Sequence, residues 1–149
     1  MFEKKTLQLL QLFYRETGRV RLLDIDALPE LDTEQQQLMH QWLETKRNFT
    51  IADITAQHWI KTCSAGHITE VILHSDGRLE EYTLFTRIKT VGSWKLDDGV
   101  IELAITKEDN DYNCSIIANR NVNIHSAIEY KNNELHSYLK LAQTLPLSV

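Results

Sequence analysis

The sequence predicts an α+β fold, in which two or three N-terminal helices precede a six- or seven-stranded antiparallel meander sheet, curved or barrel-like. First, apolar residues follow a helical period before Gly66 and strand-like alternation after it. Second, β-rich runs beyond His67 recur about every 8–12 residues, with hairpin signals at Asp76-Gly77 and Asp98-Gly99. The chain has 149 residues, so we expect one domain, 1–149, in which a helical part (1–66) packs on the sheet (67–143).

The first helix, which should end before Gly18, has a wide apolar surface. At about 100° per residue, an arc of about 220° is covered by Leu7, Leu9, Leu10, Leu12, Phe13 and Tyr14. Such an arc is wider than one sheet usually covers, so we expect the helix to be buried on two sides. The simplest way to cover the second side is a homodimer through Leu9 and Phe13. The alternative is that the connection after the helix covers it within one chain.

Asp32 predicts the start of a second helix, because Gln35 three residues later completes a capping box. This helix should end near Asn48. For the next segment we favour a third helix, from Thr50 or Thr55 to Ser64. The competing interpretation makes Trp59 to Ser64 a strand that a tight turn joins to His67.

Turn signals divide the remainder of the chain into seven expected strands. They span residues 67–75, 79–87, 88–96, 100–107, 111–119, 122–131 and 134–143. Alternation places Ile124, Ile128 and Tyr130 on an apolar face of the sixth strand, with His125 and Glu129 on the opposite, wet face. The same rule puts Trp94 on the apolar face of the third strand, as a structural residue.

The net charge of −5 argues against nucleic-acid binding, which needs a concentrated basic surface. No apolar run is long enough to predict a membrane span, and the N-terminal sequence does not resemble a signal peptide. We therefore expect a soluble cytoplasmic protein. Cys63 and Cys114 should be reduced thiols, and both are interpreted as small core residues.

No sequence motif predicts a metal or cofactor site. The six histidines form no close ligand pair, and Glu108 to Asp111 is interpreted as a polar hairpin tip. A thiolate at Cys63 activated by a neighbouring His is weighed against an inert buried thiol, and the inert thiol is favoured. We predict neither a cofactor nor a metal. The wet strand face, which carries Glu102, Thr106, His125, Glu129, His136 and Lys140, is interpreted as solvated.

Gly92-Ser93-Trp94 resembles the G-x-W signature of lipocalin-like barrels, in which a Trp closes one barrel end. The resemblance covers three residues. It also departs from the pattern, because the signature belongs to the first barrel strand and here lies mid-chain. No function is carried over from it.

The absence of catalytic motifs favours a non-catalytic binding or protein-interaction domain whose concave sheet holds a small apolar ligand or docks a protein. The expected ligand-binding residues are Trp59, Tyr82, Trp94, His125 and His136. One alternative is a small enzyme with a polar cleft between sheet and helices, where Glu70, Glu81, His125 and His136 converge. The other is a lipocalin-like binder of an apolar small molecule.

Overall fold

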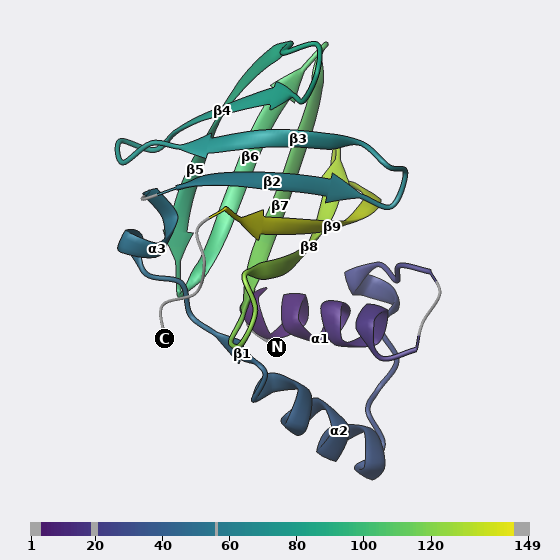
Figure 1. The fold of residues 1–149 in the computed structure, drawn as a ribbon. Coiled ribbons are helices and arrows are strands. Elements are labelled where there is room, and N and C mark those ends of the chain that lie inside the picture. Colours follow the sequence, from purple (N-terminus) through teal and green to yellow (C-terminus); the bar gives the residue numbers. More distant parts are fainter. Residues whose placement is uncertain (1–3, 19–20, 56, 145–149) are drawn as a thin grey trace.

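A computed structural model describes residues 4–18, 21–55 and 57–144 (Figure 1). The N-terminal elements are α1 (Lys4–Glu16), the 3-10 helix η1 (Ile25–Ala27), α2 (Thr33–Leu43), β1 (Lys46–Arg47) and α3 (Ile51–Thr55). Eight longer strands follow: β2 (His58–Cys63), β3 (Ile68–Leu73), β4 (Arg78–Thr83), β5 (Lys89–Asp97), β6 (Val100–Lys107), β7 (Asn110–Asn119), β8 (Ile124–Lys131) and β9 (Glu134–Gln143). The α+β prediction is confirmed, with more strands than expected.

The strands β2 to β9 form a closed antiparallel barrel. Each pairs with the next along the chain, and β9 also pairs with β2, where Trp59 lies opposite Gln143. The two-residue β1 extends the sheet beside β7. This closed meander removes every free edge among the eight barrel strands.

The favoured third helix is wrong over most of its length, and the competing strand is correct. Only Ile51–Thr55 is helical, whereas residues 58–63 form β2. Trp59 and Ile54 are fully buried, but Ile51 at the start of α3 is 54% exposed. The segment becomes a strand because β3 and β9 on its two sides satisfy its backbone hydrogen bonds.

The predicted hairpin turns are confirmed. Asp98 and Gly99 both have positive φ angles, 51° and 76°, as a two-residue hairpin of the favoured twist requires. A Cβ atom at Gly99 would lie 2.3 Å from the side chain of Asn48, so the turn also needs glycine for space. Glu108 and Asp109 form the polar tip of the next hairpin, with φ angles of 51° and 65°.

The barrel interior is packed with apolar side chains from all eight strands. Its buried members on the strands are Trp59, Val71, Leu73, Leu79, Trp94, Ile101, Leu103, Ile105, Cys114, Ile116, Ala118, Ala127, Leu139 and Leu141. Phe49 and Ile54 close the end beside α3, where the Trp59 indole donates to the Ile54 carbonyl at 3.1 Å. Figure 1 shows α3 at this end and α1 beside the wall near β8.

The helix α1 is covered on two sides within one chain, as its wide apolar arc predicted. Leu12 packs against Ile117 and Ile128 on the outer wall of the barrel, and Phe13 meets Trp42 of α2 with ring centroids 5.7 Å apart. Among the described helices, none is long and apolar enough to cross a membrane.

The interpretation of His125 and Glu129 as part of a solvated face is wrong. His125 and Glu129 point into the barrel, whereas Ile128 and Tyr130 point outward beneath α1. Alternation identified the two faces correctly but not which one lies inside. The outer face is apolar because a helix covers it, and the inner face accommodates polar residues by pairing them.

Candidate functional site

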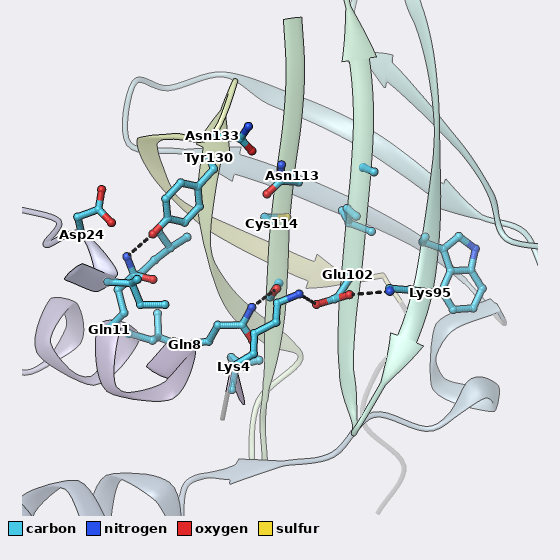
Figure 2. Close-up of a pocket in the computed structure, with 18 of the residues that line it drawn as sticks. Lys4, Gln8, Gln11, Asp24, Lys95, Glu102, Asn113, Cys114, Tyr130 and Asn133 are labelled. Atoms are coloured by element: carbon cyan, nitrogen blue, oxygen red, sulfur yellow. Dashed lines mark hydrogen bonds and ion pairs between the residues drawn. The ribbon is translucent and has the colours of Figure 1, made fainter. Parts of the chain in front are cut away.

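The candidate site is a groove of about 580 Å³ on the outside of the barrel. One side is α1, and the other is the outer face of β5, β6 and β7 (Figure 2). Tyr130 of β8 and the segment at Asp24 and Ile25 complete its walls. Its volume falls within the range of about 300–1,000 Å³ that is typical of small-molecule sites.

Three small side chains make the floor of the groove. Ser93 of β5 pairs with Ala104 of β6, which in turn pairs with Asn113 of β7. Strand alternation points all three outward, and all three are exposed. Because these side chains are short, they leave space between the barrel wall and α1.

Amide side chains of α1 line the opposite wall. Gln8 Nε2 donates to Ser115 Oγ at 2.7 Å. Gln11 Nε2 donates to the hydroxyl oxygen of Tyr130 and to the carbonyl of Leu23, both at 2.8 Å. These contacts fix the orientation of the two amides.

Ion pairs mark one end of the groove. Glu102 lies 2.6 Å from Lys4 Nζ and 3.4 Å from Lys95 Nζ. Burial alone would raise the pKa of Glu102, but the hydrogen bonds and charges of the two lysines outweigh it and hold the pKa below its usual range. The carboxylate is therefore ionised at neutral pH and forms an ion pair with each lysine.

The groove combines these polar groups with the apolar side chains of Leu12, Ile117 and Ile128. Its described lining includes no histidine. Cys114 contributes to the lining, but its thiol belongs to the barrel core, and burial raises its pKa to about 12. The arrangement thus offers hydrogen bonds and apolar contact, and pairs no nucleophile with a base.

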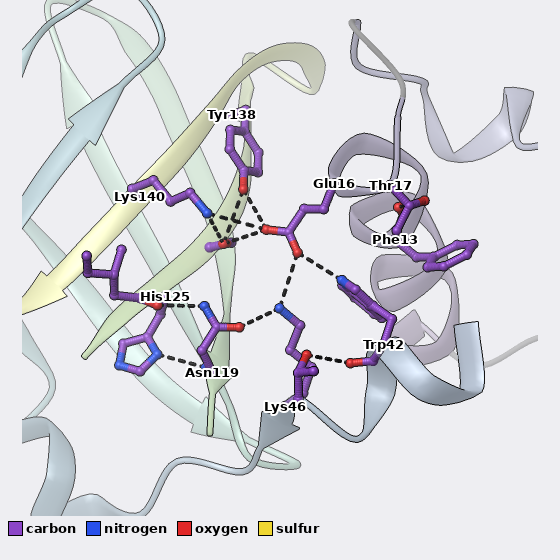
Figure 3. A network of polar contacts seen from close by, with 12 residues as sticks. Phe13, Glu16, Thr17, Trp42, Lys46, Asn119, His125, Tyr138 and Lys140 are labelled. Carbon is purple, nitrogen blue, oxygen red and sulfur yellow. Dashed lines mark hydrogen bonds and ion pairs between the residues drawn. The ribbon is translucent and has the colours of Figure 1, made fainter. Parts of the chain in front are cut away.

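A network around Glu16 holds α1 and α2 against the barrel (Figure 3). The carboxylate accepts hydrogen bonds from Trp42 Nε1 at 3.0 Å, Ser126 Oγ at 2.8 Å and the Tyr138 hydroxyl, and it pairs with Lys46 Nζ at 3.2 Å. Burial opposes ionisation, but these partners outweigh it and lower the pKa of Glu16 to about 2. The network therefore fixes the helix that forms one wall of the groove.

A second polar cluster lies inside the barrel, toward the end opposite α3. Lys61 Nζ is 2.5 Å from Glu81, which also accepts a hydrogen bond from Thr69 at 2.6 Å. Glu129 accepts from Ser137 at 3.2 Å. In the described part of the chain, no group of three or more His, Cys, Asp and Glu side chains is placed to hold a metal ion.

The expected ligand-binding residues are dispersed. Trp59 and His125 lie together at the α3 end, with ring centroids 5.9 Å apart and no exposed surface. Trp94 is 8% exposed in the barrel core, where its indole donates to the His74 carbonyl at 2.7 Å. Tyr82 lies on the outer face of β4 and stacks with Arg87. Their ligand-binding role stays a prediction.

His136 contacts a different set of residues. Its Nε2 is 3.9 Å from Glu129, and its ring packs against Tyr112. The residues of the enzyme alternative are also separated, because Glu70 pairs with His58 and Arg87 on the outer wall, whereas Glu81 pairs with Lys61 inside. The structure does not gather these residues into one cleft.

Trp94 is among the residues that line the groove, but the amide side chains of α1 that line it were missed. Gln8 and Gln11 occupy the narrow polar stripe of the first helix, which is normally a solvated surface. The only available signal was that a helix buried on two sides must also bury part of this stripe. Gln11 is in fact 3% exposed.

No protein-family model, curated protein or solved structure matches the chain. The eight-stranded up-and-down barrel is an architecture that hosts many functions, so the fold alone does not indicate one. Trp94 of the Gly92-Ser93-Trp94 sequence lies on β5 and not on the first barrel strand. A function can therefore be inferred only from the geometry of the site.

Proposed function

We propose that this protein is a non-catalytic binding domain whose groove beside α1 holds a small, uncharged polar molecule. The row of Ser93, Ala104 and Asn113 carries the proposal, because it opens a space between the helix and the wall. An uncharged ligand suits this groove, since its lining carries two lysines, Lys4 and Lys95, and two carboxylates, Glu102 and Asp24.

The polar groups of the groove suit recognition by hydrogen bonds. Gln8 and Gln11 are held in place by Ser115 and Tyr130, so little side-chain freedom remains to be lost on binding. The apolar contribution comes from Leu12 and Ile128. These polar and apolar groups together suit a ligand that has a hydrocarbon part and also carries hydroxyl or amide groups.

Filling the floor of the groove tests this function. A library of uncharged fragments is screened against the protein by NMR, and hits should shift the backbone amide signals of Gln8, Ser115 and Tyr130. Ala104→Phe should abolish the shifts, because its ring would occupy the space. Thr106→Phe is the matched control, since Thr106 is exposed on the same face of β6 but is absent from the groove lining.

Two results would contradict the proposal. One is that no fragment shifts these signals in the unmodified protein. The other is that fragments bind Ala104→Phe as well as they bind Thr106→Phe, which would place their site elsewhere.

The proposal includes a cytoplasmic location, which the two free thiols Cys63 and Cys114 support. A homodimer through Leu9 and Phe13 stays a prediction. Phe13 is only 2% exposed in one chain because it packs against Tyr14 and Trp42. Such a dimer would have to depend mainly on Leu9, and sedimentation of Leu9→Glu against the unmodified protein would test it.

A further inference from the structure

A second pocket lies on the other flank of α1. Its volume is about 340 Å³, and its walls come from α1, the end of α2, β1 and the ends of β6 and β7 that meet them. Lys5 and Leu9 of α1 line this pocket, whereas Lys4 and Gln8 line the groove described above. The two spaces share Ile117 as a boundary.

This pocket is basic in a protein whose net charge is −5. Its lining includes no acidic residue and four cationic residues, which are Lys5, Lys46, Arg47 and Arg120. Three of them have carboxylate partners that lie outside the lining, which are Asp98, Glu16 and Asp53. The local excess of positive charge is therefore centred on the fourth cation, Arg120.

The Arg120 guanidinium group has more N–H donors than its hydrogen bonds to the Lys46 carbonyl use. Its Nε and Nη2 atoms donate to the carbonyl of Lys46 at 3.3 and 3.2 Å. Among the described residues, no carboxylate forms an ion pair with it. The guanidinium group is thus oriented by one carbonyl and keeps further N–H groups for an anion.

Lys5 supplies a second oriented cation. Its Nζ donates to the carbonyl of Asp98 at 2.6 Å and to Asn48 Oδ1 at 3.1 Å, and its side chain is 26% exposed. The Asp98 carboxylate is 3.8 Å from it and 67% exposed, so water screens this ion pair. An incoming anion would gain from Lys5 without breaking a buried ion pair.

The remaining walls are apolar. They comprise Leu9, Leu43, Val100 and Ile117, and the last two are each 4% exposed. A bare inorganic anion would use only the cationic part of the pocket. A short hydrocarbon group attached to the anion would also remove apolar surface from water.

We propose that the pocket between α1, β1 and β7 binds a phosphate monoester that carries a short apolar group, with Arg120 and Lys5 holding the phosphate. Two oriented cations can share the phosphate oxygens, for which the planar guanidinium is well suited. The apolar walls hold the organic part. This site is separate from the groove, so either one can fail its test without affecting the other.

Titration with hexyl phosphate tests the site. Binding is monitored at constant ionic strength through the backbone amide NMR signals of Leu9, Val100 and Arg120. Inorganic phosphate tests the contribution of the phosphate group alone, and hexanol tests that of the hydrocarbon chain alone. Hexyl phosphate should bind more tightly than either. Arg120→Gln and Lys5→Gln should each weaken its binding by about tenfold, which corresponds to the loss of one charge-assisted contact.

Arg78→Gln is the matched control, because it removes one positive charge from an exposed residue of β4 outside the pocket and should leave the affinity unchanged. Arg120→Lys keeps the charge but loses the planar group, and it should weaken binding less than Arg120→Gln. The amide spectrum of each variant establishes that it is folded. Two results would overturn the proposal: no saturable shift with hexyl phosphate, or an equal loss of affinity in Arg78→Gln.

Discussion

His125 Nε2 and Gln143 Oε1 lie 2.6 Å apart inside the barrel, at the end covered by α3. The backbone N–H of Asn119 donates to His125 Nδ1 at 2.9 Å, so the neutral ring carries its proton on Nε2 and donates it to Gln143. Phe49 packs edge-on against the imidazole, with ring centroids 4.8 Å apart. This fully buried ring thus has both nitrogen atoms satisfied only in its neutral form.

This geometry predicts that the protein loses stability in mild acid. Burial lowers the pKa of His125 from 6.5 to about 4, which outweighs the contact with Gln143. The unfolded chain therefore binds a proton more readily than the folded chain between these two values. Stability from the neutral ring is complete above pH 6.5 and should fall by about 3 kcal/mol as the pH drops to 4.

Urea unfolding measured between pH 7 and pH 4 checks this prediction. His125→Gln cannot titrate, so it should show a flatter dependence, whereas His136→Gln should retain the steep one. His136 is a suitable control because its side chain is 43% exposed. Identical pH dependences for the unmodified protein and His125→Gln would refute the assignment.

Glu16→Gln should destabilise the attachment of the helices to the barrel. The change removes the negative charge beside Lys46, whose side chain is only 9% exposed. Removing one partner of a buried ion pair typically costs about 3–5 kcal/mol. Thermal unfolding should show the loss, and Glu44→Gln should show almost none because the Glu44 side chain is 72% exposed.

The Glu16 effect also has its own pH range. Because its pKa is lowered to about 2, its stabilising contribution is present above its ordinary pKa of 4.5 and is lost as the pH falls toward 2. This range lies below most of the range over which His125 acts. A Glu16→Gln variant that unfolds at the same temperature as Glu44→Gln would contradict the role of the network.

Trp94→Ala should be strongly destabilising. The indole is 8% exposed in the core and donates to the His74 carbonyl, so its removal leaves a cavity and an unsatisfied acceptor. Truncation of a buried Trp typically costs about 3–5 kcal/mol, a large share of the stability of a small domain. Trp94→Phe should recover part of that loss in urea unfolding, since it restores the ring but not the donor. Unchanged stability of Trp94→Ala would reject the structural role.

Most of the strands could be predicted because their signals are local. The Asp98-Gly99 turn has the backbone angles that its sequence favours, and the flanking strands alternate as expected. The segment 58–63 was harder. Its Trp59 and Cys63 fit a helical face as well as a strand, and only its pairing with β3 and β9 decides between the two.

The candidate site could not be predicted from the local sequence, for a different reason. Alternation cannot say which face of β8 is inside, since α1 covers its outer face and the inner face holds His125. The groove depends on Ala104 lying between Ser93 and Asn113, a register that spans three strands. No short window of sequence contains this information.

Lys61 and Glu81 form an ion pair inside the barrel. Their side chains are 14% and 11% exposed and lie 2.5 Å apart. Burial alone would lower the pKa of Lys61, but the charge of Glu81, with a contribution from Glu129, raises it above its ordinary value. The lysine therefore remains charged at neutral pH and depends on its carboxylate partner.

Removing one partner and removing both should have different consequences. Glu81→Gln should destabilise the protein by about 3 kcal/mol, because it leaves the buried Lys61 without its nearest carboxylate. The double variant Lys61→Met/Glu81→Gln should recover much of that loss, since it no longer buries this ammonium group and the Gln amide can still accept from Thr69. Urea unfolding of the two single variants and the double variant gives the coupling energy directly. If the two single losses simply add in the double variant, the ion pair contributes nothing of its own, and the lysine acts only through its packing.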